Sequence, residues 1–70
     1  MLKVKFKCKC VREIVAMGVV CGMAFSGTAF IDEYGDTIFV INFPCAGGMK
    51  CRQEWFENYF RITEQVGDTQ

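Results

Sequence analysis

Apolar and polar residues alternate without a break at the start of the chain, from Leu2 to Cys10. In an extended segment, one face carries the apolar residues Leu2, Val4, Phe6, Cys8 and Cys10, and the other carries Lys3, Lys5, Lys7 and Lys9. A period of two over this length predicts a β-strand with its apolar face in the core and its lysine face in water. The lysines can also protect an exposed edge of the sheet, where charged side chains discourage pairing with another chain.

The strongest hairpin pattern lies in the middle of the chain. The apolar runs Thr28–Ile31 and Thr37–Phe43 flank the polar sequence Asp32-Glu33-Tyr34-Gly35-Asp36. Short β-branched and aromatic runs around a glycine-bearing polar loop predict a β-hairpin. Gly35 suits the positive φ of a type I turn followed by a bulge, and the flanking acids suit turn positions. We expect this hairpin to be the centre of a small β-barrel.

Glycines punctuate the segment before the hairpin. We expect Val11–Met17 to form a turn or loop, Gly18 to mark a bend, and Gly22–Phe25 to open a long strand that Gly27 bends or bulges. Such glycines let a small sheet curl tightly enough to close.

The strand after the hairpin is apolar on both faces. Ile38, Val40 and Asn42 fall on one face, and Phe39, Ile41 and Phe43 fall on the other. Because one face of so small a barrel reaches solvent, Phe39 and Phe43 are candidates for exposure and for contact with a partner. The alternative is that the C-terminal segment covers them.

The C-terminal third divides at its breakers. Pro44 ends a strand because it has no N–H to donate. The expected elements are a tight turn at Ala46-Gly47-Gly48, a strand at Met49–Arg52, a helical turn at Gln53–Tyr59 and a closing strand at Phe60–Thr63. We therefore expect one domain over residues 1–64 and a polar tail over residues 65–70.

Composition limits what this chain can do. Seventy residues make one domain with a marginal core, so the 51% hydrophobic content and the seven Phe should go mostly into it. The net charge is zero, although residues 1–12 hold five bases and no acid. The whole chain therefore has no strong attraction to nucleic acid or to anionic membranes.

The five cysteines and the absence of His exclude several chemistries. Imidazole catalysis and mixed Cys/His zinc sites are impossible, and an odd number of thiols argues against a complete disulfide framework. Scattered free thiols indicate a reducing cytoplasm.

The run Ile14–Ile31 has eighteen residues without a charge, the lower limit for a membrane-spanning helix. A signal peptide with Gly27-Thr28-Ala29 as its cleavage site is a second alternative. Three glycines, with Ser26 and Thr28, dilute the hydrophobicity of this run. We favour strand segments joined by glycine bends over a membrane-associated chain.

No catalytic, cofactor or metal site is expected. Cys8 and Cys10 share a strand face and Cys45 and Cys51 flank a Gly-Gly turn, yet neither spacing is a CxxC zinc knuckle. Cys51, between Lys50 and Arg52 before a helix, is the best place for a reactive thiol. The acids Asp32, Glu33 and Asp36 suit a solvated turn better than a hydrolytic pair.

The order of these elements resembles that of small Src-homology-3-like barrels of bacterial and bacteriophage origin, mostly of unassigned function. Gly22-Met23-Ala24-Phe25 opens a long strand, an acidic glycine hairpin follows, and a short helical turn ending Trp55-Phe56-Glu57 precedes the last strand. The resemblance spans about residues 2–63. It implies an all-β, five-stranded barrel and no particular activity.

Non-catalytic binding to another protein or to itself is the expected function, with a host protein as partner if the chain comes from a phage. Trp55 and Tyr59 share a helix face and, with Phe39 and Phe43, are the candidate contacts. The alternative is binding of nucleic acid through Lys3, Lys5, Lys7, Lys9 and Arg12.

Overall fold

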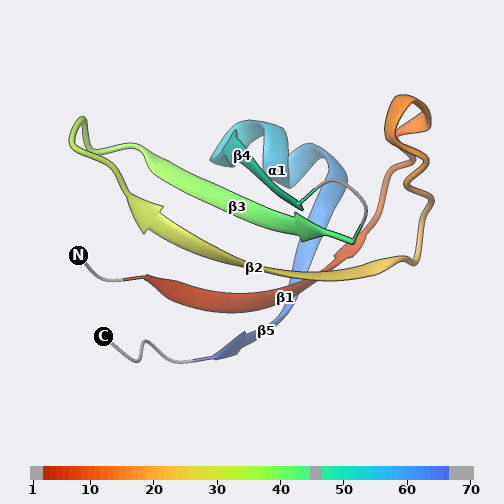
Figure 1. Cartoon of the computed structure of the whole chain (residues 1–70), viewed down its shortest axis with the longest axis horizontal. Helices are drawn as coiled ribbons and strands as arrows, with labels where there is room; N and C mark the ends of the chain where they lie inside the picture. Colours follow the sequence, from red (N-terminus) through yellow and green to blue (C-terminus); the bar gives the residue numbers. More distant parts are fainter. Residues whose placement is uncertain (1–2, 45–46, 67–70) are drawn as a thin grey trace.

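The computed structural model describes residues 3–44 and 47–66. The described residues form, in order, β1 (Val4–Cys10), the 3-10 turn η1 (Val15–Met17), β2 (Ala24–Ile31), β3 (Thr37–Phe43), β4 (Gly47–Arg52), α1 (Gln53–Tyr59) and β5 (Phe60–Val66). All strands join one antiparallel sheet in the order β4-β3-β2-β1-β5 (Figure 1). The predicted all-β class and the helical turn before the last strand are confirmed.

The sheet is not closed into a barrel, and the expectation of closure by the last strand is wrong. In the described residues β5 pairs with β1, β4 pairs with β3, and no ladder joins β4 to β5. The reason is that α1 follows β4 and precedes β5 without intervening residues, so it holds the two edges apart. The helix contacts β3, β4 and β5 and covers the opening (Figure 1).

Strand β1 has the predicted alternation, but it is an inner strand. Phe6, Cys8 and Cys10 are buried, while the lysines between them are exposed. Because β2 pairs with one side of β1 and β5 with the other, the lysines do not guard a free edge. That expectation is wrong, since the last strand occupies the edge that the lysines would have protected.

The central hairpin forms as predicted. Strands β2 and β3 pair from Ser26 opposite Asn42 to Ile31 opposite Thr37. In the turn, the Asp32 Oδ1 accepts hydrogen bonds from the backbone N–H groups of Tyr34 and Asp36, each 2.9 Å long. Gly35 has φ 87°, a conformation that other residues rarely adopt.

Gly27 is needed for close approach and makes no bulge in β2. Gly27 pairs with Phe6 of β1 and with Ile41 of β3, and the register of neither strand pair shifts at this position. A Cβ atom at this position would overlap the carbonyl oxygen of Val40 and lie 3.0 Å from the Phe6 ring. The irregularity is instead in the β1–β5 ladder, between Lys7 and Cys8.

Aromatic rings fill the concave side of the sheet. Six of the seven Phe are buried, and they make mostly tilted or edge-to-face contacts with centroids 4.2–6.5 Å apart: Phe6, Phe25, Phe39, Phe43, Phe56 and Phe60. Phe56 of α1 and Phe60 of β5 complete this cluster from the C-terminal segment. The core therefore depends on residues at both ends of the chain.

Two boundaries differ from the predictions. Gly47 and Gly48 belong to β4, which is longer than expected, while Cys45 and Ala46 lie outside the described residues. Strand β5 continues to Val66, which pairs with Lys5. The predicted start of the tail at residue 65 is therefore too early, because residues 65 and 66 belong to β5.

Candidate functional site

Phe39 and Phe43 lie in the core, and their expected exposure is wrong. Their exposed fractions are 6% and 7%. The Phe39 ring packs 4.2 Å from Phe56, and the Phe43 ring 5.0 Å from Phe25. The C-terminal helix and strand cover this face of β3, so its other face, with Asn42, is the one that meets water.

Trp55 and Tyr59 are neighbours on α1, as the helical spacing predicts. Their ring centroids are 4.7 Å apart, and both residues are half-buried against the core. Trp55 also borders a shallow groove of about 470 Å³ with Met49 and Cys51 of β4. Both rings have a packing role, and part of each remains open for contact.

Most of the exposed large hydrophobic side chains lie in a segment for which no contact site was predicted. Five of the eight exposed large hydrophobic side chains among the described residues lie between β1 and β2: Val11, Val15, Met17, Val20 and Met23. We call these five the apolar loop surface. The uncharged run beginning at Ile14 was the sequence signal for it, but we interpreted that run as strand segments joined by bends.

Local hydrogen bonds shape this loop and keep its side chains outside. Ile14 and Val19 form an isolated bridge with N–O distances of 2.8 and 3.2 Å, which closes the loop around η1. Gly18 ends η1 with φ 68°. Val19 points into the core, at 3% exposure, and Ile14 is partly buried against it, while Val15 is 80% exposed.

An apolar groove of about 430 Å³ separates this loop from the end of β3. Its lining has no charged residue: Ala16, Met17, Gly18, Val19, Met23, Phe25, Phe43 and Pro44. Phe43, buried by the core on one side, therefore contributes to the groove on the other. The two methionines are flexible and polarizable, so they can adapt to different occupants.

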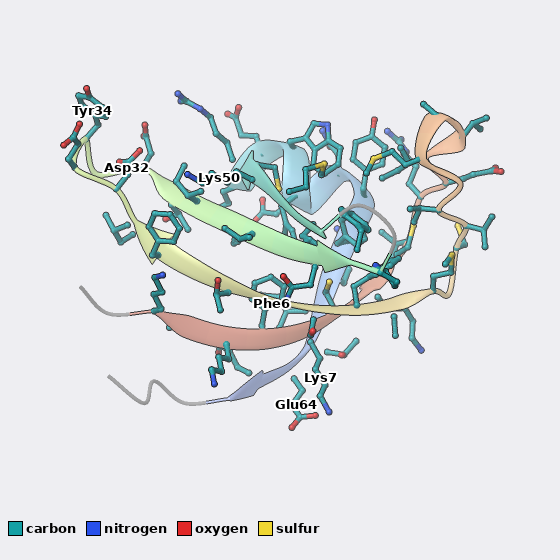
Figure 2. The ribbon with its side chains drawn as sticks, viewed as in Figure 1. Phe6, Lys7, Asp32, Tyr34, Lys50 and Glu64 are labelled. Carbon is teal, nitrogen blue, oxygen red and sulfur yellow. The ribbon has the colours of Figure 1, made fainter. Side chains whose placement is uncertain are left out.

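The predicted basic residues divide into two groups. Lys5, Lys7 and Lys9 are exposed on the outer side of β1, and Lys3 is exposed directly before this strand. We call the surface of these four lysines the lysine face. Lys7 Nζ lies 3.8 Å from a Glu64 carboxylate oxygen, and both side chains point away from the sheet (Figure 2). Arg12 lies beyond the end of β1 and is not part of this face.

The thiols of Cys8 and Cys51 are poorly suited to nucleophilic chemistry. Burial raises the pKa of Cys8 and of Cys51 from 9.0 to about 11. Cys51 is in a strand, so its neighbours Lys50 and Arg52 point to the opposite face and do not stabilise a thiolate. The expectation that Cys51 is the best place for a reactive thiol is therefore wrong.

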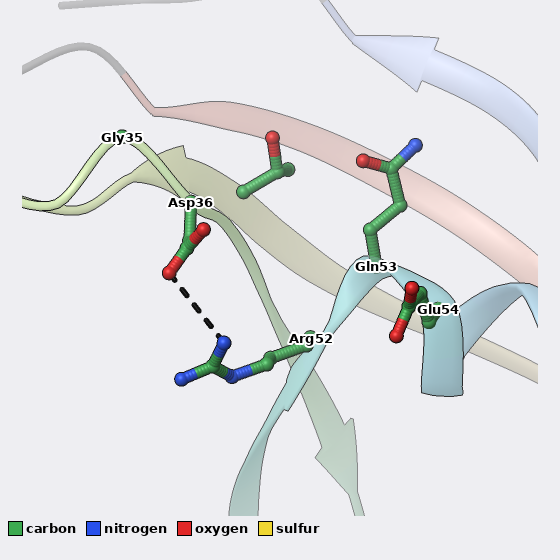
Figure 3. A pocket seen from close by; sticks show the side chains of 6 residues that line it. Gly35, Asp36, Arg52, Gln53 and Glu54 are labelled. Carbon is green, nitrogen blue, oxygen red and sulfur yellow. Dashed lines mark ion pairs between the residues drawn. The ribbon is translucent and has the colours of Figure 1, made fainter.

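The acids of the hairpin form a solvated corner next to α1. Asp36 and Arg52 make an exposed ion pair at 3.5 Å in a pocket of about 320 Å³, together with Gly35, Gln53 and Glu54 (Figure 3). Asp32 is occupied by the turn hydrogen bonds. This corner has one cation, Arg52, and two acids, Asp36 and Glu54, and these side chains are open to water.

Within residues 3–44 and 47–66, no group of three or more Cys, Asp or Glu side chains is arranged to hold a metal ion. Cys45, half of one proposed zinc pair, lies outside these residues. None of the helices described is long and apolar enough to cross a membrane.

Comparison with known proteins gave no match to any protein-family model, any curated protein or any solved structure.

Proposed function

We propose that this protein is a non-catalytic binding module that contacts another protein through the apolar loop surface and the adjoining groove. The supporting observation is that five exposed large hydrophobic side chains lie between β1 and β2, and that two of them, Met17 and Met23, line the apolar groove between η1 and the end of β3. Contiguous exposed apolar surface is characteristic of contact sites. Binding there removes Val15, Val20 and the two methionines from water.

The partner that fits this groove is an apolar segment of a polypeptide. The groove lining offers no charge to a polar ligand, and its methionines can repack around branched or aromatic side chains. Trp55 and Tyr59 lie on α1 and are proposed as secondary contacts, because their shared packing leaves them only half-exposed.

A catalytic role has little support in the described residues. The raised pKa values of Cys8 and Cys51 oppose thiolate chemistry, and the hairpin carboxylates lie in an open corner. Free thiols at Cys8, Cys10, Cys21 and Cys51 are compatible with a reducing cytoplasm, which we propose as the compartment.

We also propose that the sheet is an opened form of the Src-homology-3-like barrel. The strand order, with β5 beside β1, and the helical turn between β4 and β5 support this proposal. Bacterial or bacteriophage origin remains part of the same proposal.

The test places one charge in the apolar loop surface. We expect Val20→Glu to weaken capture of the partner by at least about tenfold, since a buried charge without a partner opposes association. The matched control is Ile31→Glu, because Ile31 is 53% and Val20 49% exposed and Ile31 lies in β2, away from the loop. Each variant and the wild-type chain are immobilised, and bound proteins are quantified by mass spectrometry.

The molar mass in solution distinguishes binding to a different protein from binding to a second copy of this chain. A wild-type mass that rises with concentration, and that Val20→Glu returns to one chain, identifies a second copy as the occupant. Equal loss of binding in both variants, or no loss in Val20→Glu, contradicts the proposal.

A further inference from the structure

The outer side of the sheet carries a second surface, which the protein-binding proposal does not use. The strand register places Lys5, Thr28, Val40 and Lys50 in one row across four strands. The neighbouring row contains Phe30, Ile38 and Arg52. The lysine face therefore continues across the sheet to the basic residues of β4.

A groove of about 340 Å³ lies at the far end of these rows. Phe30, Ile38, Lys50 and Arg52 line it, together with Asp32 and Cys51. Phe30 is the one phenylalanine that is not buried. The Lys3 ammonium lies 5.8 Å from the centroid of its ring, so the ring face is within reach of groups outside the sheet.

Charge is separated in this molecule although its net charge is zero. On the outer side, Glu64 pairs with Lys7 and Asp36 pairs with Arg52. Among the described residues, Lys3, Lys5, Lys9 and Lys50 have no ion-pair partner. Of the other acids described, Glu33 lies at the hairpin turn, Glu54 and Glu57 on α1 and Glu13 in the loop after β1. Asp32 lines the groove together with Lys50, and its Oδ1 accepts the two hydrogen bonds of the hairpin turn.

The spacing of the cations suits a chain of anions. Lys5 and Lys9 are four positions apart on β1, which places them about 13 Å apart, a distance that alternate phosphates of an extended single strand can match. Ser26 and Thr28 of β2 lie beside the lysines and offer hydroxyl groups to phosphate or sugar oxygens.

We propose that the lysine face binds single-stranded nucleic acid, with its phosphates on Lys5, Lys9 and Lys50 and one base against Phe30. A duplex hides its bases from the aromatic ring, and an acidic peptide has no planar group for the groove. This binding is independent of the apolar loop surface, which lies beyond the other end of β1.

Fluorescence anisotropy with labelled ten-nucleotide oligothymidine and oligouridine tests the proposal on the full chain. With phosphates on Lys5, Lys9 and Lys50, the logarithm of the association constant should fall with the logarithm of salt concentration with a slope of about −2. A duplex of equal length and polyglutamate should each bind at least about tenfold more weakly. Equal affinity for either of these competitors, or no binding at about 20 mM salt, overturns the proposal.

Two matched variants locate the site. Lys5→Gln and Arg12→Gln each remove one exposed positive charge, but only Lys5 is on the lysine face. We expect Lys5→Gln to reduce the salt slope by about 0.7 and to weaken binding severalfold, and Arg12→Gln to change affinity less than about twofold. Equal effects would show that only net charge matters.

Phe30→Leu separates stacking from charge. This variant keeps an apolar side chain, so folding can be verified by circular dichroism, and it should weaken binding by roughly fivefold or more at an unchanged salt slope. Unchanged affinity would show that no base stacks on Phe30 in the groove. Val20→Glu should bind the oligonucleotide as wild type does, so failure of either function leaves the other measurable.

Discussion

The inner and outer faces of this sheet are built from alternate residues of the same strands, yet they have different neighbours. On β1, Phe6 and Cys8 are 2% and 0% exposed among aromatic rings, whereas Lys5 and Lys7 meet water. An inner side chain is fixed by dense packing, so replacing it changes the free energy of unfolding. An outer one has solvent as its neighbour, so its replacement mainly changes what the protein binds.

The sharpest test of this difference uses two adjacent residues of β2. Gly27→Ala should lower the free energy of unfolding by about 3 kcal/mol or more, because the new methyl group meets backbone at Val40 and the Phe6 ring. Ser26→Ala, one residue away on the outer face, should change it by less than about 0.5 kcal/mol. Urea denaturation measures both, and similar values for the two variants would contradict the distinction between the faces.

Local patterns made the strands and their faces predictable. The alternation of β1, the glycine hairpin and the helical turn Gln53–Tyr59 each depend on residues close in sequence, and all three are confirmed. The burial of Phe39 depends on Phe56, seventeen positions later, so the pattern of β3 alone left it open. Closure of the barrel failed as a prediction because it depends on where α1 places the edge of β5.

A second prediction concerns the inner thiols. Because burial raises the pKa of Cys8 from 9.0 to about 11, the folded state retains a proton that the unfolded chain loses at lower pH. The contribution of the Cys8 thiol to the free energy of unfolding is therefore fully present below about pH 9. As the pH rises toward about 11, this contribution is lost and the free energy of unfolding falls by about 2 kcal/mol. Chemical denaturation at a series of pH values between these limits measures the slope.

Matched cysteine variants isolate the thiol from the lysines that titrate in the same range. Cys8→Ala should flatten the fall in stability with pH, while Cys21→Ala, which replaces an exposed thiol, should keep the wild-type slope. Parallel curves for wild type and Cys8→Ala would mean that burial of this thiol does not couple folding to pH.

The candidate surfaces were predictable to different degrees. The lysine face follows from period-two alternation, which fixes the side of a strand without knowledge of its partners. Phe30 and Lys50 are twenty positions apart, and only the pairing of β2, β3 and β4 brings them to one groove. The apolar loop surface was not recognised, because an apolar run favours burial and gives no sign that the loop faces away from the core.

The smallest expected effect is on the outer face, at the ion pair of Lys7 and Glu64. Their charged atoms are 3.8 Å apart, and the side chains are 63% and 58% exposed, so water and salt screen the attraction. A double-mutant cycle with Lys7→Gln and Glu64→Gln should give a coupling free energy of no more than about 0.5 kcal/mol, falling further at high salt. A coupling above about 1 kcal/mol would show that this pair anchors β5 to β1, and the outer face would then share the structural role assigned to the inner one. Glu64→Gln alone should leave stability nearly unchanged and strengthen oligothymidine binding, because it releases Lys7 as a fifth unpaired lysine, beside Lys3, Lys5, Lys9 and Lys50, on the outer side of the sheet.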